Sequence, residues 1–194
     1  ANQEAKNVAK YKVLSTTAEE AMVVADTTRH IGDFQITVST VQREADQSIV
    51  GYAVEAPSIT KSGYADRIVL MVGFVEEGDG CVVNGVEVLS QKETPGLGAN
   101  MTKEGNSLER SIVGKSAKDV KFGVTKEGGS FDALTGSTIS SRAYANAIET
   151  AYAGYLWATG RLNTSAEAVE AAPSGASMTY DNSEPEAQKG ESNE

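Results

Sequence analysis

The feature that most constrains the fold is a series of strand-like segments between residues 34 and 90, joined by short connections. Residues 34–41 alternate apolar and polar side chains, which is typical of a half-buried strand. Residues 48–54, 66–76 and 81–90 are also rich in apolar and β-branched residues, and 66–76 is apolar enough to be covered on both faces. Because the connections are too short for crossover helices, we expect these strands to pair in an antiparallel sheet.

The strongest helical pattern lies later in the chain, over about residues 139–159. Its larger apolar side chains recur at helical spacing and therefore share one helix face, which we interpret as a core face. They are Tyr144, Ile148, Tyr152, Tyr155 and Leu156. Ser137 or Thr138 is placed to cap the start of this helix, and Gly160 to end it.

Weaker patterns complete the outline. Thr17–Asp26 predicts a short helix, Ser107–Ile112 a second one, and Val120–Thr125 a further strand. Asn84-Gly85 interrupts an apolar run and indicates either a tight hairpin turn or a bulge. Together these patterns predict an α+β fold, in which helices pack on a mainly antiparallel sheet in a single domain.

Composition divides the chain into three parts. Residues 1–29 are expected to form an N-terminal helical segment, and residues 30–162 the folded domain. Residues 163–194 are rich in Ala, Ser, Glu, Pro and Gly without periodicity, which predicts a disordered acidic tail. The net charge of −10 makes nucleic acid a poor partner.

Cysteine and histidine counts exclude several kinds of chemistry. Cys81 is the single cysteine and His30 the single histidine, which excludes an intrachain disulfide and removes most hydrolase triads, Cys/His zinc sites and His-based metal centres. We therefore expect no metal ligands and no catalytic residues of the chain's own, and we expect any chemistry to come from a bound group. The first residue is Ala1, without an initiator Met or an apolar leader, as expected of a processed protein or a trimmed soluble fragment.

Two short segments are candidates for binding that group. The start of the long helix, residues 132–141, offers unpaired backbone N–H groups, a glycine and several hydroxyls, which suits a phosphate. The alternative is that its hydroxyl residues are ordinary helix caps. Residues 93–98 contain a proline and two glycines, which fix a particular loop shape. That loop either faces the edge of a planar heterocycle or is only a turn between sheet and helix.

The two segments together resemble the motifs of a known family. Asp132-Ala-Leu-Thr-Gly-Ser-Thr138 is similar to the flavinylation motif of the FMN-binding domain family, approximately Asp-x-x-Ser/Thr-Gly-Ala-Thr. Glu93-Thr-Pro-Gly-Leu-Gly98 is similar to the family's second hallmark, and Gly114-Lys115 lies between them, where members often have this pair. One position departs from the pattern, because Ser137 stands where alanine is usual.

The resemblance implies a covalent cofactor. In the family, a separate flavin transferase uses FAD and a divalent metal to attach FMN to the last threonine of the motif, which is Thr138 here. Asp132, Thr135 and Gly136 would belong with Thr138 to the sequence that the transferase recognises. Thr135, Gly136 and Ser137 are also expected to lie against the cofactor.

The resemblance also suggests where the flavin ring lies. An isoalloxazine ring needs an apolar platform and a few polar groups at its edge. The expected source is the loop formed by Glu93, Thr94, Pro95, Gly96 and Leu97, with Leu97 against the ring face. Lys115 is expected near the phosphate or the N1 side, and its alternative interpretation is a solvated surface lysine.

Within the family, the match is nearest in type to flavin-carrying subunits of Rnf electron-transport complexes and of sodium-pumping NADH:quinone reductase. It implies an electron carrier on the periplasmic face of the inner membrane, bound to other subunits of an ion-translocating complex. Its membrane attachment would be an N-terminal helix absent from this chain. The alternatives are a free-standing extracytoplasmic flavoprotein, the flavin module of a reductase, or a non-redox binding domain.

Overall fold

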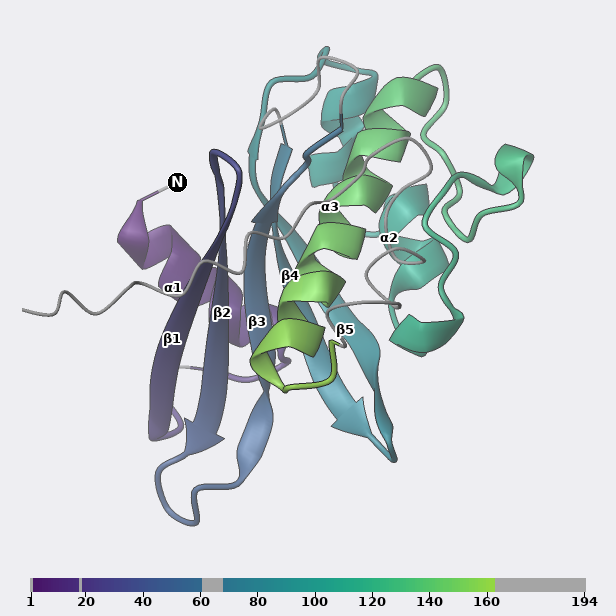
Figure 1. The fold of residues 1–194 in the computed structure, drawn as a ribbon. Coiled ribbons are helices and arrows are strands. Elements are labelled where there is room, and N and C mark those ends of the chain that lie inside the picture. Colours follow the sequence, from purple (N-terminus) through teal and green to yellow (C-terminus); the bar gives the residue numbers. More distant parts are fainter. Residues whose placement is uncertain (1, 18, 61–67, 163–194) are drawn as a thin grey trace, which may run out of the picture.

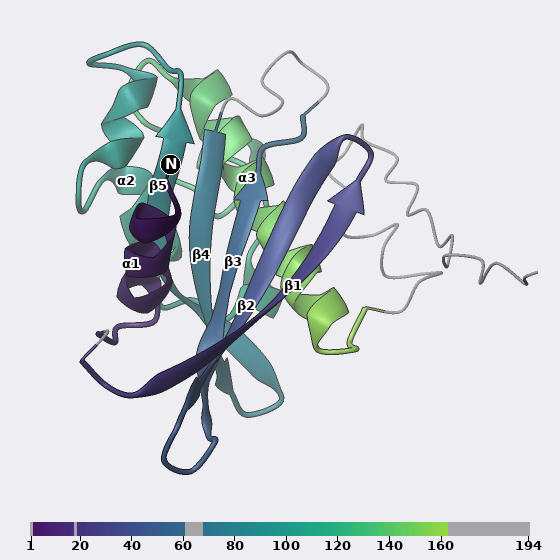
Figure 2. The same cartoon turned by 90° about the vertical axis from the view of Figure 1, so that its left-hand side faces the viewer.

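The computed structural model describes residues 2–17, 19–60 and 68–162. Its centre is a five-stranded antiparallel sheet in which each strand pairs with its neighbours in sequence (Figure 1). The strands are β1 (Met22–Ile31), β2 (Phe34–Arg43), β3 (Ile49–Pro57), β4 (Ile68–Glu77) and β5 (Gly80–Gln91). The sheet is strongly twisted, so that β1 runs obliquely to β4 (Figure 2). The predicted α+β fold with an antiparallel sheet is confirmed.

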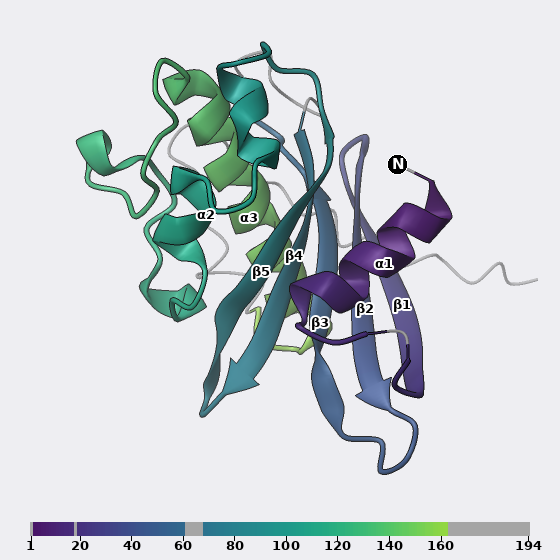
Figure 3. The same ribbon diagram turned by 180° about the vertical axis from the view of Figure 1, so that it is seen from behind.

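Three α-helices accompany the sheet in the described part of the chain: α1 (Gln3–Val13), α2 (Ser107–Ile112) and α3 (Thr138–Ala158). α3 crosses one face of the sheet and α1 lies on the opposite face (Figures 1 and 3). Short 3₁₀ helices at Gly98–Thr102, Ala117–Asp119 and Thr125–Glu127 join the larger elements. None of the described helices is both long and apolar enough to span a bilayer.

The main core lies between the sheet and α3. Tyr144, Ile148 and Tyr155 of α3 are almost fully buried, as the periodicity predicts. The Tyr155 ring stacks on Phe74 of β4, with ring centroids 5.3 Å apart, and Tyr144 meets Phe131 edge to face at 6.3 Å. Aromatic contacts of this kind add to the burial energy and fix the position of α3 along its length.

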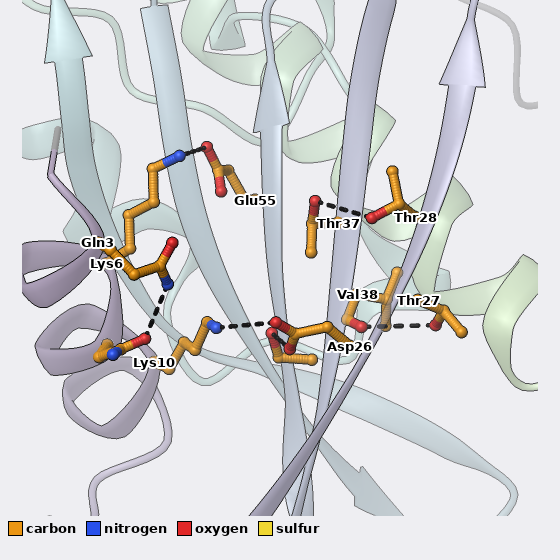
Figure 4. Close-up of polar contacts among 11 residues, drawn as sticks. Gln3, Lys6, Lys10, Asp26, Thr27, Thr28, Thr37, Val38 and Glu55 are labelled. Carbon is orange, nitrogen blue, oxygen red and sulfur yellow. Dashed lines mark hydrogen bonds and ion pairs between the residues drawn. The ribbon is translucent and has the colours of Figure 1, made fainter.

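α1 is held on the other face in two ways. Its last residue, Val13, lies so close to Gly73 of β4 that a Cβ on Gly73 would collide with the Val13 carbonyl. The polar side of α1 faces a cleft of about 630 Å³ over β1–β3. Two ion pairs cross this cleft from α1 to the strands. Lys6 Nζ lies 2.8 Å from the Glu55 carboxylate, and the buried Lys10 lies 3.4 Å from that of Asp26 (Figure 4).

The helix predicted over Thr17–Asp26 is wrong. β1 begins at Met22 and pairs with β2 along its whole length. Val23 and Val24 are β-branched and favour a strand, and the pairing with β2 outweighs the weak helical periodicity. The helix of the expected N-terminal helical segment is α1, which lies earlier in the chain than predicted and which Asn2 caps by accepting a hydrogen bond from the Ala5 N–H.

Of the remaining secondary-structure predictions, some are wrong and some are confirmed. The strand expected over Val120–Thr125 is wrong, because this stretch contains only a 3₁₀ turn and an isolated bridge from Val124 to Phe131. Asn84 is a bulge rather than a hairpin turn, since Gly85 and Val83 pair with the consecutive residues Gly73 and Phe74. The helix over Ser107–Ile112 and the long helix are confirmed.

The domain division remains a prediction, although two structural facts bear on it. The boundary at residue 30 falls inside β1, which is part of the sheet. The expected acidic tail, residues 163–194, lies outside the described residues.

Candidate functional site

The loop that follows β5 contains a tight turn at Thr94–Leu97. The Leu97 N–H donates to the Thr94 carbonyl at 3.1 Å, with Pro95 at the second position and Gly96 at the third. Gly96 has φ +77°, and this positive φ identifies a type II turn, for which Pro-Gly is the favoured pair. Asn100 Nδ2 donates to the Gly96 carbonyl at 2.9 Å and holds the turn from outside.

A second turn of the same kind precedes α3. The Ser137 N–H donates to the Leu134 carbonyl at 3.1 Å, and Gly136 has φ +69° at the third position. The two turns meet, because a Cβ built on Gly136 would lie 3.4 Å from the Leu97 side chain. Two segments about forty residues apart in the sequence therefore form one surface.

α3 begins without a side-chain cap. Ser137 occupies the N-cap position, but its hydroxyl makes no capping hydrogen bond. In α1 and α2, by contrast, Asn2 and Asn106 accept hydrogen bonds from the first-turn N–H groups. The first N–H groups of α3 have no carbonyl partner within the helix, so its positive dipole end is available to an anion. The simple capping interpretation of the hydroxyl residues is therefore not supported.

Between the two turns and the start of α3 lies a hollow of about 440 Å³. Its volume is in the range of small-molecule sites. The lining residues are Thr94, Leu97, Gly98, Gly136, Ser137, Thr138, Ile139 and Ser140. Two of them, Leu97 and Ile139, are large apolar side chains left 43% and 50% exposed.

One partly buried hydrogen bond joins the loop to the helix. Ser140 Oγ of α3 donates to the Glu93 carboxylate at 2.7 Å, and Glu93 is only 9% exposed. Gly98 packs against the same pair, since a Cβ there would collide with Ser140 Oγ. Glu93 therefore lies behind the hollow and is not among its lining residues.

An exposed contact also joins the first turns of α3 to a neighbouring segment. The Arg142 guanidinium donates to the carboxylate of Glu127, in the Thr125–Glu127 turn. This hydrogen bond lowers the pKa of Glu127 and raises that of Arg142. Both groups are exposed, so the pair contributes little to stability and serves mainly to place the turn beside α3.

The structure brings together most of the predicted site residues. Thr94, Leu97, Gly136, Ser137 and Thr138 line the hollow, while Pro95 and Gly96 shape the turn behind it. Asp132 and Thr135 are exposed on the segment that leads into α3.

Lys115 is not brought to this site. Its side chain is exposed, its carbonyl accepts from Val83 of β5, and it is not among the residues of the hollow. Sequence reasoning missed Ile139 as a lining residue, although an apolar residue directly after the predicted acceptor was a usable signal. Among the described residues, no group of three or more acidic, cysteine or histidine side chains could hold a metal ion.

The geometry fits a molecule that combines a phosphate with an apolar planar body. The uncapped helix end attracts the phosphate, and the Thr138 hydroxyl lies at that end without a hydrogen bond to any described residue. Leu97 and Ile139 add exposed apolar surface to the lining of the hollow. These properties suit a ligand that carries a phosphate.

Comparison with known proteins shows which family the chain resembles. Residues 63–153 match the FMN-binding domain family, and this range contains both turns and the whole hollow. The resemblance predicted from the two motifs is therefore confirmed.

Individual relatives belong to redox complexes. One is a protein of the ion-translocating oxidoreductase complex of Shewanella baltica, 41% identical over 105 residues, which cover 53% of this chain and 47% of the relative. Its counterpart in Shewanella oneidensis is 38% identical over 102 residues, 51% of this chain and 47% of that protein. A component of the Na(+)-translocating ferredoxin:NAD(+) oxidoreductase complex of Acetobacterium woodii is 36% identical over 109 residues, 54% and 49% of the two chains. The chain thus spans about half the length of the curated relatives it matches.

Proposed function

We propose that this chain is an electron-carrier subunit of an ion-translocating oxidoreductase complex of the Rnf type, and that it carries FMN as a phosphoester on Thr138. The observation that carries the proposal is the start of α3, which has no side-chain cap and places Thr138 among the lining residues of a hollow between two turns. The names of the relatives favour a complex over a free-standing flavoprotein.

The chain's own residues have two tasks at this site besides providing the Thr138 oxygen. The first N–H groups of α3 hold the phosphate, while Leu97 and Ile139 give the ring apolar contact. FMN, when bound, supplies the redox chemistry that the side chains lack. An exposed charge–dipole contact is worth only about 0.3–1 kcal/mol, so an ester bond is what prevents loss of the carrier by dissociation.

The attachment conserves atoms and charge. The Thr138 oxygen attacks the flavin-side phosphorus of FAD, the pyrophosphate bond breaks, AMP leaves and the hydroxyl proton is released. A flavin transferase that uses a divalent metal is the proposed catalyst, with Asp132, Thr135, Gly136 and Thr138 in its recognition sequence. In the proposed complex, the chain lies on the periplasmic face of the inner membrane and contacts other subunits.

Intact-mass measurement after co-expression with a flavin transferase tests the proposal. The unmodified sequence should gain the mass of one FMN less one water and remain yellow after denaturation. Thr138→Val should gain nothing, because it removes the acceptor oxygen at nearly constant volume. Ser137→Ala is the matched control and should still gain FMN, because it removes a neighbouring hydroxyl only. A full mass gain in Thr138→Val would show that the acceptor is another residue.

A further inference from the structure

The start of α3 carries four hydroxyl residues within five positions: Ser137, Thr138, Ser140 and Ser141. Each has an oxygen able to attack a phosphorus, and three of them line the same hollow. The sequence pattern alone does not explain why one hydroxyl is modified rather than its neighbours. The hydrogen bonds and the burial of the four side chains do provide a reason.

Two of the four hydroxyl residues are inaccessible to an incoming phosphate because they are buried. Ser141 is completely buried, and its hydroxyl donates to the Ser137 carbonyl at 2.8 Å while accepting from the Leu134 N–H at 3.0 Å. Ser137 is only 7% exposed, although it borders the hollow. These two residues build the second turn, which leaves Thr138 and Ser140 as the competing acceptors.

Thr138 and Ser140 differ in their partners. The Ser140 hydroxyl proton is donated to Glu93, and its oxygen lies against Gly98 so closely that even a methyl group would not fit there. Thr138 is half-buried, and no described residue forms a hydrogen bond with its hydroxyl. The carboxylate beside Ser140 also repels an incoming phosphate, since both are anions.

We infer that Glu93 is a positioning residue that selects the acceptor: by holding Ser140, it leaves Thr138 as the hydroxyl that takes the flavin phosphate. This inference rests on the proposed function. It changes the role of Glu93, which the sequence placed at the edge of the flavin ring. Ser140 is chemically competent, but it is shielded by Gly98 and by the negative charge of Glu93.

The test locates the flavin by tandem mass spectrometry of peptides after co-expression with a flavin transferase. The protein without substitutions should carry flavin almost entirely on Thr138, with a small Ser140-to-Thr138 ratio as the reference. Glu93→Ala should raise the ratio of Ser140 to Thr138 modification at least tenfold, because Ser140 loses both its partner and the repelling charge. Glu93→Gln keeps an oxygen that accepts from Ser140 but removes the charge, so its ratio should lie between the other two.

Thr138→Val provides the sharpest comparison. With Glu93 intact this variant should stay unmodified, whereas Thr138→Val/Glu93→Ala should gain flavin on Ser140, and adding Ser140→Ala should abolish that gain. Modification of Thr138 alone in both Glu93 variants would overturn the inference while leaving the proposed function standing. Absence of flavin from Thr138 in the protein without substitutions would instead overturn the proposed function.

Thermal melting of each variant guards against a folding artefact. A merely structural Glu93 would lower the melting temperature and the total modification together, without moving flavin to Ser140. If Glu93→Ala does not fold, Glu93→Gln decides by the same ratio, because it preserves the size of the side chain. A ratio unchanged in a folded Glu93→Gln would then overturn the inference.

Discussion

Glu149 makes the stability of this protein depend on pH in an unusual direction. It lies on α3, is only 6% exposed, and forms no ion pair or hydrogen bond with any described residue. Burial raises the pKa of Glu149 from 4.5 to about 8, because the charged form is not solvated. The folded protein therefore keeps this proton at neutral pH, while the unfolded chain releases it. The Glu149 carboxyl thus stabilises the fold below pH 4.5, and that contribution is lost as the pH rises to about 8.

The size of this loss follows from the pKa shift. Each pH unit between the unfolded and folded pKa values lowers the free energy of unfolding by about 1.4 kcal/mol. At pH 7 the accumulated loss is about 3 kcal/mol. Glu149→Gln removes the titration while keeping the shape of the side chain. The variant should therefore gain stability over the protein without substitutions as the pH rises. We expect this difference in the free energy of unfolding to be about 3 kcal/mol larger at pH 8 than at pH 5.

Urea unfolding at pH 5, 6, 7 and 8 measures this difference directly, and thermal melting should show a rise of about 6–12 °C for the variant at pH 7. Glu44→Gln is the matched control, because Glu44 is exposed in the connection after β2 and should change stability little at any of these pH values. A stabilisation by Glu149→Gln that is independent of pH, or that is larger at pH 5, would refute the reasoning.

Two further substitutions test the turn and the helix packing. Gly136→Ala forces a side chain onto φ +69° and against Leu97, so it should cost about 1 kcal/mol by thermal melting and slow flavin attachment; unchanged values for both would contradict the role of the turn. Gly73→Ala places a methyl group on the Val13 carbonyl, so it should cost about 1–3 kcal/mol and speed hydrogen exchange in α1. Exchange in α3 should change far less, and equal acceleration in both helices would argue against this packing account.

The sheet was predictable because its signals are local. Residues 34–39 alternate apolar and polar side chains, and the connections between the strands over residues 34–90 are too short for crossover helices, so the positions and the antiparallel order of these strands follow from the sequence. The first thirty residues were not predictable in the same way. Ala21, Met22, Val24 and Ala25 fit weakly to a helix, and only the pairing with β2 decides for a strand.

The candidate site was predictable in part. The Pro-Gly turn at 94–97 and the Thr-Gly pair before α3 have local conformations that their own residues dictate, and the family resemblance indicated that they act together. The direction of a loop side chain has no such local signal. Glu93 therefore points to Ser140 rather than into the hollow, and Lys115 lies beside β5, for reasons of tertiary packing alone.

α3 carries the proposed acceptor at its first residue and the aromatic core along the rest of its length. A helix of this length is about 30 Å long, and close-packed interiors transmit strain. We therefore expect a change of packing where Tyr155 stacks on Phe74 to be felt at the start of α3, which lines the hollow. A core substitution far from the hollow is consequently a way to change the width of the proposed flavin site without altering any of its lining residues.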